Sequence, residues 1–121
     1  MADGWGVAGA NTALDAHGTA YPWIKLHVGS PGAAGTTSTA TETTRKQASW
    51  ASAANGAKAT GADLTWTNVA GSETYTHYSQ WSAATNGSFG GSGAITANPV
   101  TAGDTFTVPS GSLILTLPLA S

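Results

Sequence analysis

The three histidines, His17, His27 and His77, are the residues best suited to chemistry, since neutral imidazole acts as a base and as a metal ligand. None of them forms an HxH or HxxxH pair, and no cluster of carboxylates accompanies them. The spacing therefore predicts no metal site. We expect His27 and His77 to hydrogen-bond to the backbone or to a neighbouring strand.

A serine and an acid could extend one of these histidines into a hydrolytic triad. Ser79 lies two residues after His77, and Asp104 could supply the carboxylate. The sequence has no nucleophile elbow or oxyanion turn, which acyl transfer needs. The six acidic residues are also scattered singly, without the local pair typical of glycoside hydrolysis. We therefore expect no enzymatic activity.

The segment "LHVGSPGAAG", residues 26–35, carries Gly29, Gly32 and Gly35 at three-residue spacing. A phosphate-binding loop would end in Gly-Lys-Ser or Gly-Lys-Thr and lead into a helix, and neither feature is present. Pro31 followed by Gly32 is typical of a type II turn, in which the glycine has a positive φ. The segment predicts a bend after a strand, and we expect no cofactor.

Composition limits the classes of partner. The 121 residues suit one domain, and the net charge of −2, with 8% charged residues, disfavours nucleic acid and anionic membranes as partners. The absence of cysteine excludes disulfides and thiolate zinc sites. We expect neither a signal peptide nor a membrane span, because no basic residue precedes an apolar run near the N-terminus and no apolar run is long enough.

Hydrophobic alternation predicts mainly strands. One short helix is expected over residues 10–18, capped by Asn11 or Thr12 and ended by Gly18. Strands are expected at 21–29, 45–52, 57–60, 64–67, 73–81 and 93–97, with two more across the Pro-Ser-Gly turn within 104–119. Short strands at this spacing predict an all-β fold: a single antiparallel, jelly-roll-like β-sandwich over 10–121, preceded by an arm at 1–9.

Four residues are candidates for a protein interface. Trp50, Trp66 and Trp81 lie within expected strands and should pack in the core, whereas Trp5 lies in the glycine-flanked arm. We expect Trp5 and Val7 to dock on another subunit or a neighbouring protein. The cationic pair Arg45 and Lys46 has two open interpretations, a solvated strand end or an ion pair with an acidic surface. The threonine-rich stretch 36–44 before this pair should be an exposed excursion.

Six phrases in a fixed order resemble a family of short tailed-phage virion proteins, known as head decoration or phage tail fibre proteins. They span about residues 10–117 and read "NTALDAHGTAYP", "KLHVGSPGAAG", "RKQASWA", "THYSQWSAATNGSF", "GSGAIT" and "VTAGDTFTVPSGSLILTL". The chain departs from the family pattern where Lys46 stands between the arginine and the glutamine of "RKQA". The resemblance implies a small all-β protein, made in the host bacterial cytoplasm, that coats or extends a virion.

The expected function is capsid decoration, in which the protein binds the outer surface of the phage head and stabilises the assembled lattice. The expected partners are the major capsid protein and further copies of the chain, in a trimer or another symmetric cluster. A tail fibre or tail-tip module is the first alternative, although the chain lacks a coiled-coil or repetitive shaft. A glycan-binding attachment module is the second. It would need two exposed coplanar aromatic rings, drawn from Trp23, Trp50, Trp66 and Trp81.

Overall fold

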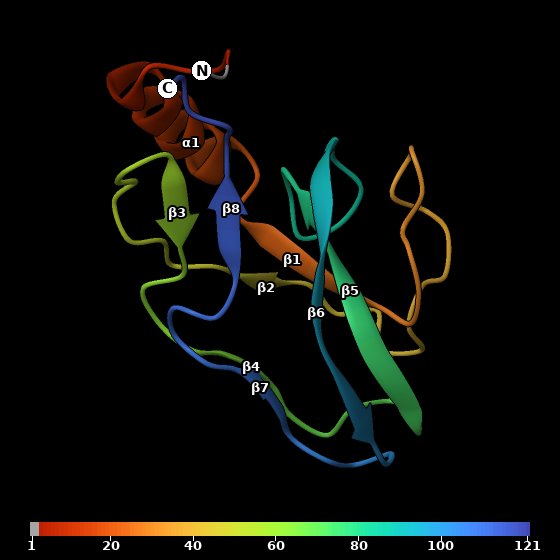
Figure 1. Cartoon of the computed structure of the whole chain (residues 1–121). Coiled ribbons are helices and arrows are strands. Elements are labelled where there is room, and N and C mark those ends of the chain that lie inside the picture. The colour runs from red at the N-terminus through yellow and green to blue at the C-terminus, as the bar shows by residue number, and fades with distance from the viewer. Residues whose placement is uncertain (1–2) are drawn as a thin grey trace.

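A four-stranded antiparallel sheet forms one layer of the computed structural model, which describes residues 3–121 (Figure 1). Its strand order is β2-β1-β5-β6, so β1 and β5 lie in the centre and pair over five residues. The strands are β1 (Trp23–His27), β2 (Lys46–Gln47), β5 (Glu73–Trp81) and β6 (Phe89–Val100).

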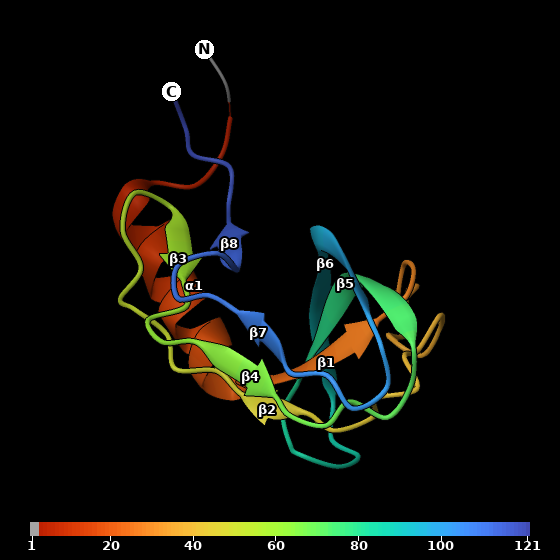
Figure 2. The same ribbon diagram turned by 90° about the horizontal axis from the view of Figure 1, so that it is seen from below.

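Two separate two-stranded sheets form the opposite layer (Figure 2). In one, β3 (Ala57–Ala59) pairs with β8 (Ile114–Thr116). In the other, β4 (Leu64–Trp66) pairs with β7 (Phe106–Val108). The described residues thus contain eight strands in antiparallel sheets and one helix. The predicted all-β, sandwich-like fold is confirmed.

The core lies between the layers and is built from the inward residues of these strands. Ile24 and Leu26 of β1 are buried, as their alternation predicts. Trp66 and Tyr75 each pack a ring against Phe106, with centroids 5.9 and 5.0 Å away. Aromatic rings supply much of the apolar area, so a core with many small residues can still drive folding.

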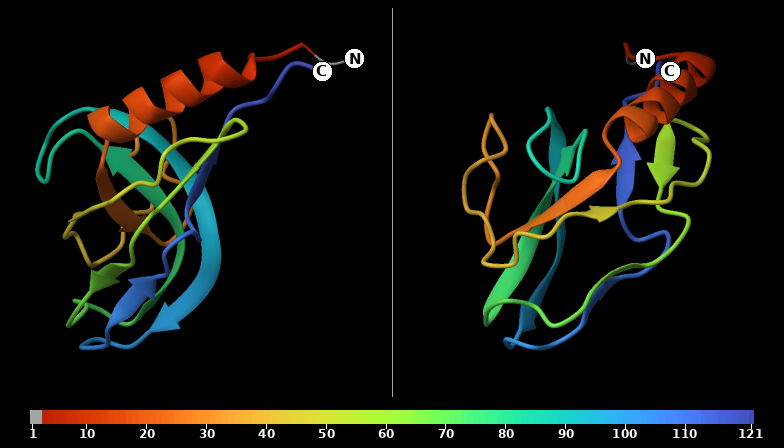
Figure 3. Two further views of the ribbon diagram at one scale, coloured as in Figure 1. Left: turned by 90° about the vertical axis from the view of Figure 1, so that its left-hand side faces the viewer. Right: turned by 180° about the vertical axis from the view of Figure 1, so that it is seen from behind.

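Helix α1 (Val7–Ala20) is longer than the sequence predicts (Figure 3). It begins after Gly6 with no side-chain cap, so Asn11 and Thr12 lie inside it. Gly18 does not end the helix. It is buried, and a Cβ there would lie 2.6 Å from Cε of Lys58, so its missing side chain lets the helix lie against β3.

The predicted arm at residues 1–9 is also corrected where it is described, while residues 1 and 2 lie outside the described part. Residues 7–9 are helical, and Trp5 forms a parallel bridge with Leu119. The amide of Trp5 donates to the carbonyl of Pro118 (2.8 Å), and the amide of Ala120 donates back to Trp5 (2.8 Å). The N-terminal segment is therefore bonded to the C-terminal segment. No local sequence pattern predicted this contact.

Polar contacts attach the helix to the β3 sheet. Asp15 accepts a hydrogen bond from the ammonium of Lys58 (2.6 Å) and one from the amide of Ala53 (2.9 Å). Asn11 accepts from the amide of Gly56 (3.0 Å). Asn11, one of the two residues predicted to cap the helix, thus binds the segment before β3 instead.

Three further expectations need correction. The strand expected at 45–52 is only two residues long, and the one expected at 93–97 extends over all of β6. The two C-terminal strands do not pair with each other across the Pro-Ser-Gly turn, since β7 pairs with β4 and β8 with β3. Their partners lie far away in the sequence, so local alternation could locate the strands but not their pairing.

The threonine-rich stretch is not a free excursion, because carboxylates hold its backbone. Glu73 accepts hydrogen bonds from the amide of Thr41 through both oxygens (3.0 and 2.9 Å). Glu42 is buried and accepts from the amides of Thr44 and Ala70, each at 3.2 Å. The stretch is thereby tied to β5 and to the segment before it.

Candidate functional site

The most chemically suggestive group in the molecule joins His27, Ser79 and Trp81. Nε2 of His27 lies 2.7 Å from Oγ of Ser79, and the indole N–H of Trp81 donates to the same oxygen at 2.7 Å. Nδ1 of His27 lies 2.9 Å from the carbonyl oxygen of Thr37, which can only accept. The proton is therefore on Nδ1, and Ser79 donates its own proton to Nε2.

This serine–histidine contact has the atoms of a catalytic dyad but not its setting. His27 and Ser79 are both 0% exposed, so a substrate has no approach to the hydroxyl. Desolvation by burial lowers the pKa of His27, which keeps the ring neutral. The group links β1, β5 and the loop after β1, and we interpret it as a structural network.

The triad considered from the sequence does not assemble. His77 lies beside Thr76, with Nδ1 2.8 Å from its hydroxyl, and Ser79 bonds to His27 instead. Asp104 accepts a hydrogen bond from the amide of Thr101 (2.8 Å). The register places His77 opposite His27, and Ser79 reaches His27 diagonally from the position opposite Lys25. The loop that contains Thr37 bonds to the other ring nitrogen of His27.

The segment after β1 is the predicted bend. Gly32 has φ +78° and Gly35 has φ +73°, and the amide of Thr37 donates to the carbonyl of Pro31 at 2.9 Å. A Cβ on Gly35 would lie 2.4 Å from the ring of Phe89, so this glycine also permits close packing. The turn chemistry was readable from the Pro-Gly pair.

The described part of the chain holds neither a cluster of metal-ligating residues nor a membrane-spanning helix. Residues 3–121 hold no group of three or more histidine, cysteine, aspartate or glutamate residues that could bind a metal ion. None of the helices described there is long and apolar enough to span a membrane.

Trp5 and Val7, the two predicted interface residues near the N-terminus, are 45% and 47% exposed. The backbone of Trp5 folds back on its own domain, yet the indole stays accessible. Trp5 lies along one cavity with Ile114, which is 53% exposed and which we had not singled out in the sequence. The alternation of Leu113, Ile114 and Leu115 could have identified Ile114 as the outward residue.

Arg45 and Lys46, the other two predicted interface residues, have different surroundings. The guanidinium of Arg45 lies 4.3 Å from the centroid of the Trp81 ring and donates to the carbonyls of Ala83 (2.9 Å) and Asn86 (2.7 Å). Burial lowers its pKa from the usual value. Arg45 thus holds the turn between β5 and β6, whereas Lys46 is half-buried in the edge strand β2.

The tryptophans do not form the platform expected of a glycan-binding module. Trp66 and Trp81 are buried, and Trp23 and Trp50 are half-buried. Trp5 is therefore the one tryptophan of the chain that is exposed, all five being described. The pair of exposed coplanar rings that this alternative requires is absent from those four positions.

A cavity of about 470 Å³ lies between α1, β6 and β8, a feature that the sequence did not reveal. Trp5 and Ile114 lie on its wall with Leu14 of the helix and Leu117 of the C-terminal segment. The cavity is formed by segments from both ends of the chain and from β6, so no local motif could predict it.

The chain is thus a sandwich-like β-fold with an enclosed polar network and with exposed apolar side chains at Trp5, Val7 and Ile114. Residues 9–116 match the family described as Podophage GP4 fiber I protein gp80. The match covers most of the chain, and the protein belongs to this family of tailed-phage virion proteins. It is a phage virion structural protein, as the order of its motifs indicated. None of the curated proteins matches the chain in sequence.

Proposed function

We propose that this protein is a subunit of a fibre that projects from a podophage virion and that it attaches through the surface around Trp5. The observation that carries the proposal is the exposure of Trp5, Val7 and Ile114 in a chain whose family is named for a fibre. Large apolar side chains gathered at one end of a small domain are typical of an interaction site.

The surface is also rigid enough to serve for attachment. Two backbone hydrogen bonds join Trp5 to the C-terminal segment, so its indole is presented from fixed backbone. An anchor that is already ordered loses little conformational entropy when it binds, and tryptophan is enriched among the residues that dominate interface energy. We propose that Trp5 is such an anchor and that the protein acts without catalysis.

Capsid decoration is the second candidate, and the shape of the domain favours it. The described residues hold short strands and one helix of 14 residues, with no coiled coil to form a shaft. A compact subunit can bind across joints between molecules of the major capsid protein and stabilise the lattice by linkage. Self-association as a trimer or another symmetric cluster would suit either location.

The location can be tested on purified virions. Heads and tails are separated, the protein is quantified in each fraction by mass spectrometry, and intact particles are labelled with a specific antibody fragment. The fibre proposal expects label on appendages and enrichment with tails. Enrichment with heads at a fixed copy number would favour decoration, and absence from both fractions would overturn both candidates.

The attachment surface is tested by Trp5→Ala in the infecting phage. Val28→Ala is the matched control, since Val28 is also exposed (39%) but lies just after β1, which ends at His27. We expect Trp5→Ala to reduce the copies per virion at least tenfold and Val28→Ala to leave them unchanged. Equal incorporation of the two variants would remove Trp5 from the attachment surface.

A further inference from the structure

Strand β6 has one open edge. It pairs with β5 on one side and ends the order β2-β1-β5-β6, so the backbone groups of its other edge lack a strand partner within the described chain. None of its twelve residues is charged. Exposed edges are usually protected by charged side chains, because an open edge is a template for another strand.

Residues of β6 line two cavities. Residues 92–94 line the cavity of about 470 Å³, and residues 95–98 line a second cavity of about 350 Å³. The far side of the first is β8 and the far side of the second is β7. Each of these two strands also has a single partner, β3 or β4. Strands with an unused edge thus lie on both sides of the two cavities, which together we call the edge groove.

The charge of the edge groove restricts what can enter it. No aspartate, glutamate, lysine or arginine lines either cavity, and the lining is aliphatic, aromatic, hydroxyl, amide and imidazole. A charged side chain placed there would lose its hydration without gaining a counter-charge. An uncharged segment would lose far less hydration free energy on entering the groove.

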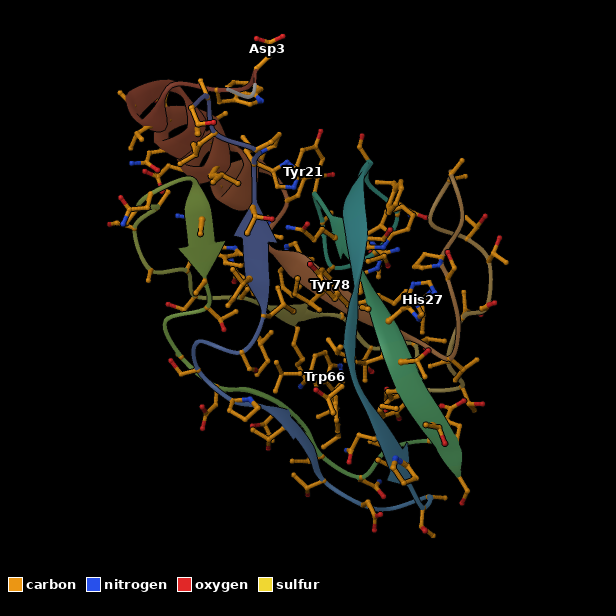
Figure 4. The ribbon with its side chains drawn as sticks, viewed as in Figure 1. Asp3, Tyr21, His27, Trp66 and Tyr78 are labelled. Carbon is orange, nitrogen blue, oxygen red and sulfur yellow. The ribbon has the colours of Figure 1, made fainter. Side chains whose placement is uncertain are left out.

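Tyr78 offers a polar group to the edge groove. It lies between β6 and β8 (Figure 4), lines the larger cavity and is only 4% exposed. Its hydroxyl forms no hydrogen bond to another described residue, but it is not fully enclosed, since the fully buried side-chain atoms without a partner in the described chain belong to Trp50 and Tyr75. Gly93 lies directly opposite on β6, where its missing side chain leaves room for the phenol ring.

We propose that the edge groove receives an extended, uncharged segment of another virion protein, which adds a strand beside β6. Backbone groups of the segment would bond to the open edge, and alternate side chains would enter the cavities. A carbonyl of the segment would accept the hydroxyl proton of Tyr78. The ladder is irregular opposite Thr76, where β6 has extra residues, so the added strand bends between the two cavities. The inference rests on the proposed function, because the protein that supplies the added strand is a component of the virion.

Amide hydrogen exchange tests the added strand directly. The exchange of β6 is measured in the purified protein and in intact virions, with residues 77–81 of β5 as an internal control because they are paired with both β1 and β6. We expect the amides within residues 90–98 that face the open edge of β6 to exchange at least tenfold more slowly in virions. Unchanged exchange would overturn the proposal. Slowing in the purified protein that grows with its concentration would overturn it too, since the donor would be a second copy.

A matched pair of substitutions separates this inference from the proposed function. Ser92→Lys places a charge at an exposed position on the edge groove, and Thr74→Lys places one at an exposed position of β5. We expect equal urea midpoints for both purified variants, and at least a tenfold loss from virions for Ser92→Lys alone. Normal incorporation of Ser92→Lys would overturn the added strand and leave the proposed function standing. Absence of the wild-type protein from virions would instead defeat the proposed function.

Discussion

His27 and Ser79 are 52 residues apart in the chain, yet Nε2 of the first lies 2.7 Å from Oγ of the second. The contact spans two central strands and uses every hydrogen-bonding atom of the imidazole, because Nδ1 donates to Thr37. In a core with few charged residues, this network specifies the register of β1 against β5 and the position of the loop after β1.

The first prediction concerns Ser79→Ala. Removing the hydroxyl leaves Nε2 of His27 and the indole N–H of Trp81 without their buried partner. A buried group left unpaired costs about 1–3 kcal/mol, so we expect a loss of roughly that size in the free energy of unfolding. Urea denaturation measures it. Ser92→Ala, at an exposed position, is the control, and equal midpoints for the two variants would refute the structural role.

The second prediction is a dependence of stability on pH. Burial lowers the pKa of His27 in the folded protein below the ordinary value of 6.5. The unfolded chain then binds a proton more readily, so this stability is fully present above pH 6.5 and is lost as the pH falls toward the lowered pKa. We expect the urea midpoint to fall between pH 7 and pH 5. His27→Gln should flatten that part of the profile, and an unchanged profile in His27→Gln would contradict the prediction.

The third prediction concerns the threonine-rich stretch. Glu73→Ala removes both acceptors of the Thr41 amide, while Glu73→Gln keeps one carbonyl oxygen. We expect faster hydrogen exchange at residues 41–44 in Glu73→Ala and an intermediate effect in Glu73→Gln. Exchange that does not differ between Glu73→Ala and the wild type would show that other contacts hold the stretch.

The fourth prediction compares two glycines with positive φ. Gly35 has φ +73° and Gly111 has φ +83°, so alanine at either position adopts a left-handed conformation at a cost of about 1–2 kcal/mol. At Gly35 the new Cβ would also meet the ring of Phe89, whereas nothing lies within 4 Å at Gly111. We expect Gly35→Ala to lower the thermal midpoint clearly more than Gly111→Ala. Equal shifts would mean that the Phe89 ring moves freely.

The fifth prediction concerns the helix attachment. The ammonium of Lys58 is nearly buried and bonds to Asp15 (2.6 Å) and to the carbonyl of Ala51 (2.9 Å). Breaking a pair from one side leaves the other charge unbalanced, so Asp15→Ala should lower the thermal midpoint more than Lys58→Met does. The order is measured by circular dichroism at 222 nm. The reverse order would show that the aliphatic part of the Lys58 side chain contributes more to thermal stability than its charge does.

Sequence patterns predicted those features of the structure that depend on residues close together in the chain. Alternation located β5 at its observed bounds, the Pro-Gly pair located the bend after β1, and six ordered phrases indicated the virion family that residues 9–116 match. The helix was found but started too late, because its ends depend on Gly6, on the C-terminal segment and on the buried contact of Gly18 with Lys58.

The candidate sites depend on contacts between distant segments, and only the tertiary structure decides those. Ser79 bonds diagonally across the strands to His27, although the register places His77 opposite His27. Arg45, for which the sequence left a solvated strand end and an acidic partner open, instead bonds to the β5–β6 turn. The edge groove lies between β6, helix α1, which precedes β6 in the chain, and strands β7 and β8, which follow it. Composition and alternation determine that this chain folds as a β-protein of low charge; the pairing of its strands determines which atoms are left free to bind.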